Sequence, residues 1–246
     1  MGFNKSLLAG KRILVTGAGK GIGRACALSC AALGADVIAL ARTESDLNEL
    51  ASLATGNIEL WIEDVTSERL LKRISRLDRL DGLLNNAGTN RVGPMAAQSV
   101  DNIDAVIGLN IRALYRVSQA SIPVLRKSGG GSIVNMSSQM GHVGSPDRTL
   151  YCMSKHAVEG LTKAMAVELA QDNVRVNTVA PTFVLTDLTE PMLADTSFSE
   201  FVMGMIPMKK LASQEEVANA CIFLLSDLSG STTGTCLKVD GGWTAQ

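Results

Sequence analysis

Short apolar runs alternate with longer amphipathic segments from Lys11 onward. The apolar runs are rich in Val, Ile and Leu, as expected of strands that are covered on both faces. The longer segments carry apolar residues at helical spacing. Because strands that alternate with helices form parallel sheets, we predict a single α/β domain over residues 1–246, with helices on both faces of a seven-stranded parallel sheet.

The boundaries of these runs define the predicted elements. Strands are predicted at Arg12–Thr16, Asp36–Ala41, Ile58–Ile62, Gly82–Asn85, Gly131–Met136, Arg175–Val179 and Cys236–Val239. Helices are predicted at Ile22–Leu33, Glu44–Leu53, Glu68–Leu77, Val100–Leu125, Leu150–Gln171 and Gln214–Leu225. The one long irregular segment, residues 182–210, follows the sixth strand, and we expect it to form a lid. Its methionines fit either an adaptable substrate cover or simple packing.

Composition and charge exclude several classes of protein. The 246 residues carry a net charge of -1 with both signs interspersed, which favours a small-molecule partner over nucleic acid. No apolar stretch is long enough to span a bilayer and no signal-peptide core is present, so we expect a soluble, cytoplasmic protein without membrane association. The five cysteines are scattered without metal-ligand spacing, which predicts reduced thiols and no metal site. His142 and His156 have no Cys or carboxylate partner in the sequence and are expected to be non-catalytic.

A glycine-rich turn follows the first predicted strand and leads directly into a helix. Glycine allows close backbone approach, so such a turn can direct backbone N–H groups and a helix N-terminus at a diphosphate. The spacing departs from GxGxxG, and a purely structural turn would need fewer glycines. We therefore predict a dinucleotide site formed by Gly17, Gly19, Lys20, Gly21, Ile22 and Gly23.

Charge at the end of the second strand indicates which dinucleotide binds. An NAD site places Asp or Glu there, whereas an NADP site has Arg nearby for the 2′-phosphate. This chain has Arg42 and no carboxylate at that position, and Lys20 in the glycine turn adds a second cation. NADP(H) is therefore the predicted cofactor. The alternative is that both cations are ordinary surface charges.

Two further strand ends carry candidate cofactor ligands. Asp64 and Val65 follow the third strand, where a carboxylate can meet an adenine amino group, although Asp64 fits equally well as a helix cap. Asn86, Ala87 and Gly88 follow the fourth strand, where small residues let a nicotinamide ribose approach closely.

The reactive residues are predicted from helix spacing and strand ends. Tyr151 and Lys155 are four residues apart on one helical face, where the ammonium would favour the phenolate and lower the tyrosine pKa. The pair would act as a general acid and base. Ser138 follows the fifth strand and could donate to a substrate carbonyl. Asn110 interrupts a long helix, either as a satisfied core amide or as the holder of a water that relays protons to Lys155.

The order and spacing of these motifs resemble the short-chain dehydrogenase/reductase family over essentially the whole chain. The resemblance implies a Rossmann-type, doubly wound fold and a homotetramer. It also implies that Tyr151 is the acid and base and contacts the cofactor, that Lys155 lowers its pKa and binds the ribose, that Ser138 orients the substrate and that Asn110 completes the proton relay. Nicotinamide contacts are implied for Pro181, Val184 and Thr186, although Thr182 stands where the family more often has glycine.

Several short stretches resemble the dicarbonyl/L-xylulose reductase branch of this family, which implies that Gln139 touches the substrate. Arg148 lies one helical turn before Tyr151, where a guanidinium would favour a hydroxyl-rich or anionic substrate, unless it is a solvated loop residue. The predicted function is NADP(H)-dependent hydride transfer to a small polar ketone such as a ketose, dicarbonyl or keto acid. The alternatives are reduction of a 3-oxoacyl thioester and a catalytically silent NADP sensor.

Overall fold

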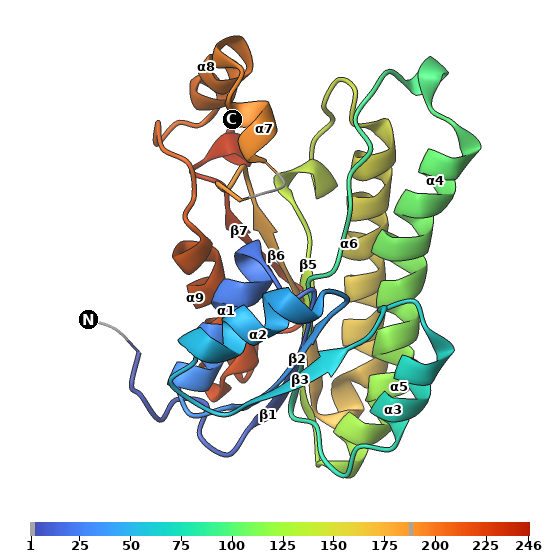
Figure 1. Ribbon diagram of the computed structural model, residues 1–246, viewed down its shortest axis with the longest axis vertical. Helices are drawn as coiled ribbons and strands as arrows, with labels where there is room; N and C mark the ends of the chain where they lie inside the picture. The colour runs from blue at the N-terminus through green and yellow to red at the C-terminus, as the bar shows by residue number, and fades with distance from the viewer. Residues whose placement is uncertain (1–2, 187–188) are drawn as a thin grey trace.

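Seven parallel strands form one twisted sheet in the computed structural model, which describes residues 3–186 and 189–246 (Figure 1). The strand order is β3-β2-β1-β4-β5-β6-β7. The strands are β1 (Arg12–Thr16), β2 (Asp36–Ala41), β3 (Ile58–Ile62), β4 (Gly82–Asn85), β5 (Gly131–Met136), β6 (Val174–Pro181) and β7 (Cys236–Val239). The predicted doubly wound fold is confirmed. All strand bounds match the prediction except those of β6, which is longer at both ends.

Helices cover both faces of the sheet, because successive strand side chains point to opposite sides. Ile13 and Val15 join the core under α1 (Gly21–Ala32), α2 (Glu44–Leu53) and α9 (Gln214–Leu225), whereas Leu14 between them joins the opposite core. That second core lies under α3 (Glu68–Ser75), α5 (Leu114–Lys127) and α6 (Thr149–Leu169). Figure 1 shows the two helical layers on either side of the strands.

The long helix predicted at Val100–Leu125 is interrupted by a π-helical segment. It consists of α4 (Val100–Val106), the π-helical segment η2 (Ile107–Ala113) and α5. Asn110, within η2, is buried and bonded to the backbone of Thr89. A wider turn accommodates such a buried polar group, and π segments occur frequently at functional sites.

The segment 182–210 is not irregular as predicted, because it contains two helices, α7 (Glu190–Leu193) and α8 (Thr196–Met205). The side chain of Asp195 caps α8 by accepting from the N–H of Phe198. Aromatic rings contribute to its packing together with aliphatic side chains and Met205. Phe183 lies 5.5 Å from Phe198 and 5.9 Å from Trp243 between ring centroids, so the segment is anchored to the C-terminal residues.

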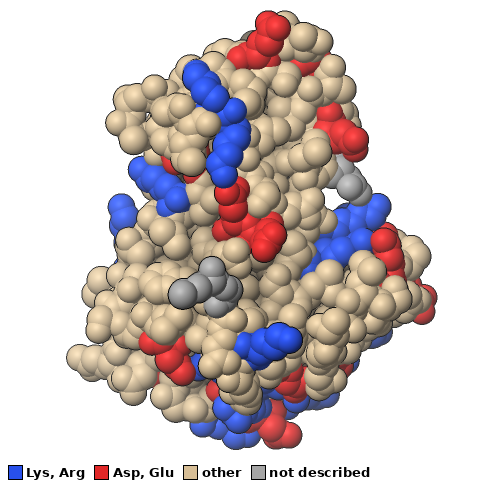
Figure 2. Space-filling view, turned by 90° about the vertical axis from the view of Figure 1, so that its left-hand side faces the viewer, with Lys and Arg blue, Asp and Glu red and all other residues tan. Residues whose placement is uncertain are grey.

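The surface over α1 and α9 is largely uncharged, and its acidic and basic side chains are scattered (Figure 2). That face therefore presents no continuous basic area. In the described part of the chain, no helix combines the length and apolarity that a membrane span requires. All five cysteines are unpaired.

Candidate active site

The predicted site residues come from the carboxyl ends of adjacent strands. The sheet order reverses between β1 and β4, and open α/β sheets bind ligands in the crevice at such a switch point. Gly17 follows β1, Asn86 follows β4, and Ser138 follows β5. The fold therefore brings three separate motifs to one edge.

The glycine turn depends on close packing that only glycine permits. Gly17 has a φ of +66°, in the left-handed region. A Cβ on Gly23 would lie 2.1 Å from the Gly17 carbonyl oxygen and 2.4 Å from Asn86 Nδ2. Lys20, the N-cap of α1, makes no side-chain capping hydrogen bond. The first-turn N–H groups of α1 are therefore available to an anion, as a diphosphate site requires.

Asn86 and Ala87 fix the end of β4 to the glycine turn. Asn86 Nδ2 donates to the carbonyl oxygens of Thr16 at 3.1 Å and Gly17 at 3.2 Å. The Thr16 hydroxyl accepts from the backbone N–H groups of Asn86 and Ala87 at 3.0 and 3.1 Å. A Cβ on Gly88 would lie 3.3 Å from Asn110 Oδ1, which leaves little space there for a side chain. These residues thus shape the crevice.

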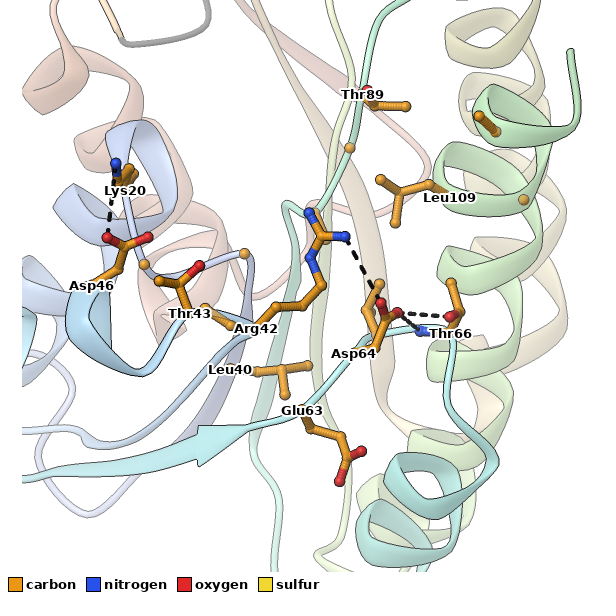
Figure 3. Close-up of a pocket in the computed structure, with 18 of the residues that line it drawn as sticks. Lys20, Leu40, Arg42, Thr43, Asp46, Glu63, Asp64, Thr66, Thr89 and Leu109 are labelled. Carbon is orange, nitrogen blue, oxygen red and sulfur yellow. Dashed lines mark hydrogen bonds and ion pairs between the residues drawn. The ribbon is translucent and has the colours of Figure 1, made fainter. Parts of the chain in front are cut away.

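Both predicted cations lie on a cleft of 630 Å³ at the edge of β2 and β3 (Figure 3). Lys20 Nζ lies 3.7 Å from Asp46 Oδ1, and Arg42 Nη1 lies 3.9 Å from Asp64 Oδ2. The Arg42 side chain is 77% exposed. Its long ion pair and high exposure leave the guanidinium able to turn toward a ligand in the cleft.

Asp64 is not a helix cap, so that alternative is wrong. Its Oδ1 accepts from the backbone N–H of Thr66 at 2.8 Å and from the Thr66 hydroxyl at 2.6 Å, whereas Ser67 caps α3. Asp64 and its neighbour Val65 both line the cleft. Asp64 forms a local turn because a short carboxylate readily accepts from the N–H two residues on.

Several residues of this cleft were missed in the sequence. Thr43, Asp46, Thr66 and Thr89 all line it. Asp46 comes from the first turn of α2, and only the packing of that helix beside the glycine turn brings it there. Thr43 directly follows Arg42, so a search of the residues flanking the predicted cation would have found it.

Ser138, Tyr151 and Lys155 line one cavity of 140 Å³, together with Ile22 and Asn86 from the cofactor side. Lys155 Nζ donates to the Met136 carbonyl at 2.7 Å and lies 5.4 Å from the centre of the Tyr151 ring. A hydroxyl, a phenol and an ammonium therefore converge beside the glycine turn.

The expected lowering of the tyrosine pKa is not found. Burial raises the pKa of Tyr151 to about 12, against the opposing effect of Ser138. Burial also lowers the pKa of Lys155 to about 8, against the opposing charge of Glu159. Loss of hydration penalises both charged forms, and the ammonium is directed at the Met136 carbonyl. The phenol is therefore held in its protonated form.

Asn110 is a satisfied core amide in this structure. Its Oδ1 accepts from the N–H of Thr89 at 2.8 Å, and its Nδ2 donates to the Thr89 carbonyl at 2.9 Å and to Ser154 Oγ at 3.0 Å. Both amide hydrogens are thereby used. Asn110 thereby connects the loop after β4 to Ser154 of α6, the residue directly before Lys155.

The segment after β6 reaches the glycine turn. Pro181, Val184 and Thr186 line the same cavity as Tyr151. Val184 is buried and forms an isolated bridge with Ala212. A Cβ on Gly21 would lie 3.4 Å from Thr186 Cγ2, so Thr186 packs directly over the start of α1. This arrangement brings the three predicted nicotinamide contacts together with the reactive residues.

Gln139 and Arg148 are both buried, with 1% and 5% of their surface exposed. They line a second cavity, to which Ser138 and Tyr151 also contribute. The alternative of a solvated loop arginine is therefore wrong. Arg148 occupies the N-cap position of α6, directly before the helical turn that carries Tyr151.

His142 has two partners that the sequence did not reveal. Its Nε2 lies 3.1 Å from Cys236 Sγ and 3.2 Å from Glu159 Oε1. Cys236 is 94 residues away along the chain, so only the docking of β7 brings the two together. In a nucleophile–histidine–acid relay, the nucleophile and the acid contact different ring nitrogens of the histidine. Here both Cys236 and Glu159 lie at Nε2, so the group does not form such a relay. His156 is exposed and contacts the Cys152 carbonyl.

Comparison with known proteins agrees with this geometry. A family model described as Enoyl-(Acyl carrier protein) reductase matches residues 17–244. The chain is 38% identical to L-xylulose reductase from Mus musculus, over 97% of this chain and 98% of that protein. It is also 38% identical to the 3-oxoacyl-(acyl-carrier-protein) reductase of Thermotoga maritima, over 96% and 98%.

A solved structure of a putative NAD(P)-dependent gluconate 5-dehydrogenase from Beutenbergia cavernae, with bound NADP at low occupancy, has a TM-score of 0.93. It shares 34% identity and the match covers 99% of this chain and 100% of that one. Family model, relatives and fold agree on an oxidoreductase that acts on CH–OH and C=O groups. The chain belongs to the short-chain dehydrogenase/reductase family.

Proposed function

We propose that this protein transfers hydride between NADP(H) and a small polar ketone or the corresponding secondary alcohol. The observation that carries the proposal is the convergence of Ser138, Tyr151 and Lys155 on one cavity, which Ile22 of the glycine turn also lines. A protonated phenol, a hydroxyl and an ammonium at one point suit protonation of a carbonyl oxygen. Their joint presence argues against a catalytically silent sensor.

In the proposed mechanism, the hydroxyl of Ser138 donates a hydrogen bond to the substrate carbonyl and holds it against Tyr151. Tyr151 donates its proton to the carbonyl oxygen, and in the reverse direction it accepts the proton of the alcohol. When bound, NADPH supplies the hydride for the carbonyl carbon. Because burial raises the pKa of Tyr151 to about 12, the phenol is protonated at neutral pH and is prepared for reduction. Lys155 adds positive charge that stabilises the oxygen charge formed on proton loss.

The glycine turn and its surroundings fit the proposed cofactor. The uncapped start of α1 and the close packing of Gly23 suit a diphosphate. Arg42 and Lys20 supply cations for a 2′-phosphate at the far end of the cleft. The relative from Beutenbergia cavernae with bound NADP supports the same choice. Asp64 and Val65 are proposed to face the adenine, and Pro181, Val184 and Thr186 the nicotinamide.

A small polar ketone is preferred over a 3-oxoacyl thioester because of Arg148 and Gln139. Both are buried polar side chains in the cavity beside Tyr151, where a long acyl chain would meet a charge. The similarity to L-xylulose reductase supports this choice. The thioester reaction remains the second candidate because the chain is also 38% identical to a 3-oxoacyl-(acyl-carrier-protein) reductase.

A substrate panel tests the proposal. We expect NADPH oxidation with L-xylulose or diacetyl, with much less activity when NADH replaces NADPH and with acetoacetyl thioester. Tyr151→Phe should lower kcat by about 10²–10⁴-fold, because it removes the proton donor, while NADPH binding is retained. Absence of carbonyl-dependent NADPH oxidation, or full activity of Tyr151→Phe, would refute the proposal.

We also propose that the protein works in the cytoplasm. All five cysteines are unpaired, and Cys26, Cys30 and Cys221 are buried as free thiols. Free buried thiols suit a reducing compartment.

A further inference from the structure

The cavity beside the reactive residues contains buried polar atoms that lack partners. It has a volume of 70 Å³ and shares Ser138, Tyr151 and Thr182 with the larger reactive cavity, so the two are neighbours. Four of its side-chain atoms are buried without a hydrogen-bond partner: Asn90 Oδ1, Gln139 Nε2, Arg148 Nη1 and Thr182 Oγ1. Of these residues, Arg148, Gln139 and Thr182 are 5%, 1% and 7% exposed. Buried polar groups are normally paired, so a group of four indicates a ligand site.

The charge of Arg148 is not balanced by the protein. Its Nη2 contacts Met192 Sδ at 3.2 Å, a weak acceptor, and its guanidinium carbon lies 5.9 Å from the centre of the Phe198 ring. Within residues 3–186 and 189–246, no carboxylate forms an ion pair with it, although Asp147 precedes it in the chain. Removing an unpaired cation from water costs several kcal/mol. An anion in this cavity would recover much of that cost.

The surrounding charges have one sign. Of the described residues that line the two cavities, only Arg148 and Lys155 carry a charge, and both are cations. Arg148 is the N-cap of α6 and Tyr151 lies one helical turn later, so both side chains reach the same space. A substrate whose carbonyl lies at Ser138 and Tyr151 would therefore extend its far end toward Arg148.

We propose that the substrate is a hydroxylated keto acid, with its carboxylate on Arg148 and its chain hydroxyls on Gln139 and Thr182. This inference rests on the proposed function and narrows it to one substrate class. The planar guanidinium fork matches a carboxylate with two parallel hydrogen bonds. A phosphate dianion would leave one negative charge unbalanced, because Arg148 is the only cation among the described residues that line the smaller cavity. Gln139 Nε2 and Thr182 Oγ1 suit the hydroxyl oxygens of a sugar-like chain.

A matched set of ketones tests the inference by turnover. 5-Keto-D-gluconate and L-sorbose have the same configuration and differ only in a terminal carboxylate against a hydroxymethyl group, and L-sorbose 6-phosphate carries a dianion instead. We expect kcat/KM to be about 10–100-fold higher for the keto acid than for L-sorbose, the usual worth of a charged hydrogen bond. Equal values for the two, or a higher value for the phosphate, would overturn the inference while leaving the reductase activity established.

Variants connect the preference to Arg148. Arg148→Leu should bring the ratio of the two kcat/KM values close to one, and Arg148→Lys should retain part of it because charge remains without the fork. Lys163→Leu removes an exposed cation from the same helix and should leave the ratio unchanged. Retained NADPH binding shows that each variant is folded. An unchanged ratio in folded Arg148→Leu contradicts the inference.

Equilibrium binding tests the inference independently of catalysis. D-Gluconate should bind the NADP⁺ complex more tightly than D-glucitol, its neutral counterpart, and Arg148→Leu should remove the difference, as measured by calorimetry. Equal binding of the two would overturn the carboxylate site even if ketones are reduced. Absence of turnover with every ketone would refute the proposed function, and the binding difference would still decide the role of Arg148.

Discussion

At the scale of single residues, the environment of Tyr151 differs most from its sequence expectation. Spacing from Lys155 predicted a lowered pKa, but burial raises the pKa of the phenol to about 12. Lys155 Nζ is instead directed at the Met136 carbonyl. Helical spacing specifies which side chains share a face, but their hydration depends on everything packed around them.

The protonation of Tyr151 can be measured directly because the chain has only two tyrosines. In Tyr115→Phe, all tyrosinate absorbance comes from Tyr151, and we expect almost none at pH 10, where an ordinary tyrosine is about half ionised. Because a cationic nicotinamide ring favours the phenolate, saturating NADP⁺ should increase the absorbance at that pH. Half-ionisation of Tyr151 at pH 10 in the free protein would contradict the expected effect of burial.

Arg42 is expected to determine cofactor choice. Arg42→Ala should raise the KM for NADPH by about 10–100-fold, because charged hydrogen bonds to a 2′-phosphate are lost, and should leave the KM for NADH nearly unchanged. Steady-state kinetics with both cofactors measure the effect. As a control, Arg126→Ala removes an exposed cation that is paired with Asp172, away from the cleft. An unchanged KM for NADPH in Arg42→Ala would show that Arg42 is an ordinary surface charge.

At the scale of elements, the apolar pattern predicted the order of strands and helices. One predicted helix differs from the structure at a buried polar residue. The bounds of α2 and α9 match the prediction, but the helix predicted over Val100–Leu125 contains the π-helical segment with Asn110. The amide bonds to the backbone of Thr89, a contact between distant parts of the chain. Hydrophobic periodicity predicts that a segment is helical and which face is buried. It does not predict a local change of helix type that accompanies a single tertiary contact.

The turn between β1 and α1 should not tolerate a side chain at Gly23. In Gly23→Ala, the Cβ would lie 2.1 Å from the Gly17 carbonyl oxygen, so backbone must move. We expect a loss of about 1–3 kcal/mol in the free energy of unfolding, typical of overpacking, together with weaker NADPH binding. Denaturant unfolding and fluorescence titration measure the two effects.

Gly204→Ala provides the matched control on α8. Apart from the backbone of its own helix, no atom of the described residues lies within 4 Å of the Cβ that would be added there. This substitution should stabilise the protein by roughly 0.5–1 kcal/mol, because alanine loses less backbone entropy in a helix. Equal stability changes in the two variants would contradict the role given to Gly23.

At the scale of the whole molecule, one basic cluster stands out among otherwise interspersed charges. It surrounds a hollow on α3 and its C-cap and consists of Arg69, Lys72, Arg73 and Arg76. Arg69 forms an ion pair with Glu63 and Arg73 with Glu59, and Arg73 also stacks on Trp61. Half of the cluster is therefore neutralised locally, in keeping with a small-molecule enzyme.

We propose that α5 and α6 form the subunit contact of the homotetramer that the family resemblance implies. Tyr115 on α5 and Met153 and Val167 on α6 are 51%, 45% and 81% exposed. Exposed apolar side chains that form a contiguous patch can mark a subunit contact. We expect light scattering to give four times the chain mass of 25.9 kDa.

Substitution should locate this contact. Val167→Glu is expected to reduce the assembly to dimers or monomers, because a carboxylate would be buried without a partner. Leu53→Glu alters a residue that is 56% exposed on α2, across the sheet, and should leave the mass unchanged. A monomeric wild type, or a tetrameric Val167→Glu, would contradict the assignment.

The sequence by itself determined the fold class, nearly all strand bounds and the glycine turn, because these features depend on the local physical chemistry of neighbouring residues. Alternation of apolar runs and the conformational freedom of glycine are properties of neighbouring residues, and they are visible without coordinates. The motif residues of the site could be named for the same reason, because each follows a strand end or a helical spacing.

Only the tertiary structure decided the protonation of Tyr151, the partners of His142 and the burial of Arg148. Burial depends on which distant segments pack together, and α7, α8 and the C-terminal Trp243 close over the site from far along the chain. Hydration and unbalanced charge are properties of that enclosure. We expect these properties to determine how the proposed reactive residues behave and which substrate the site accepts.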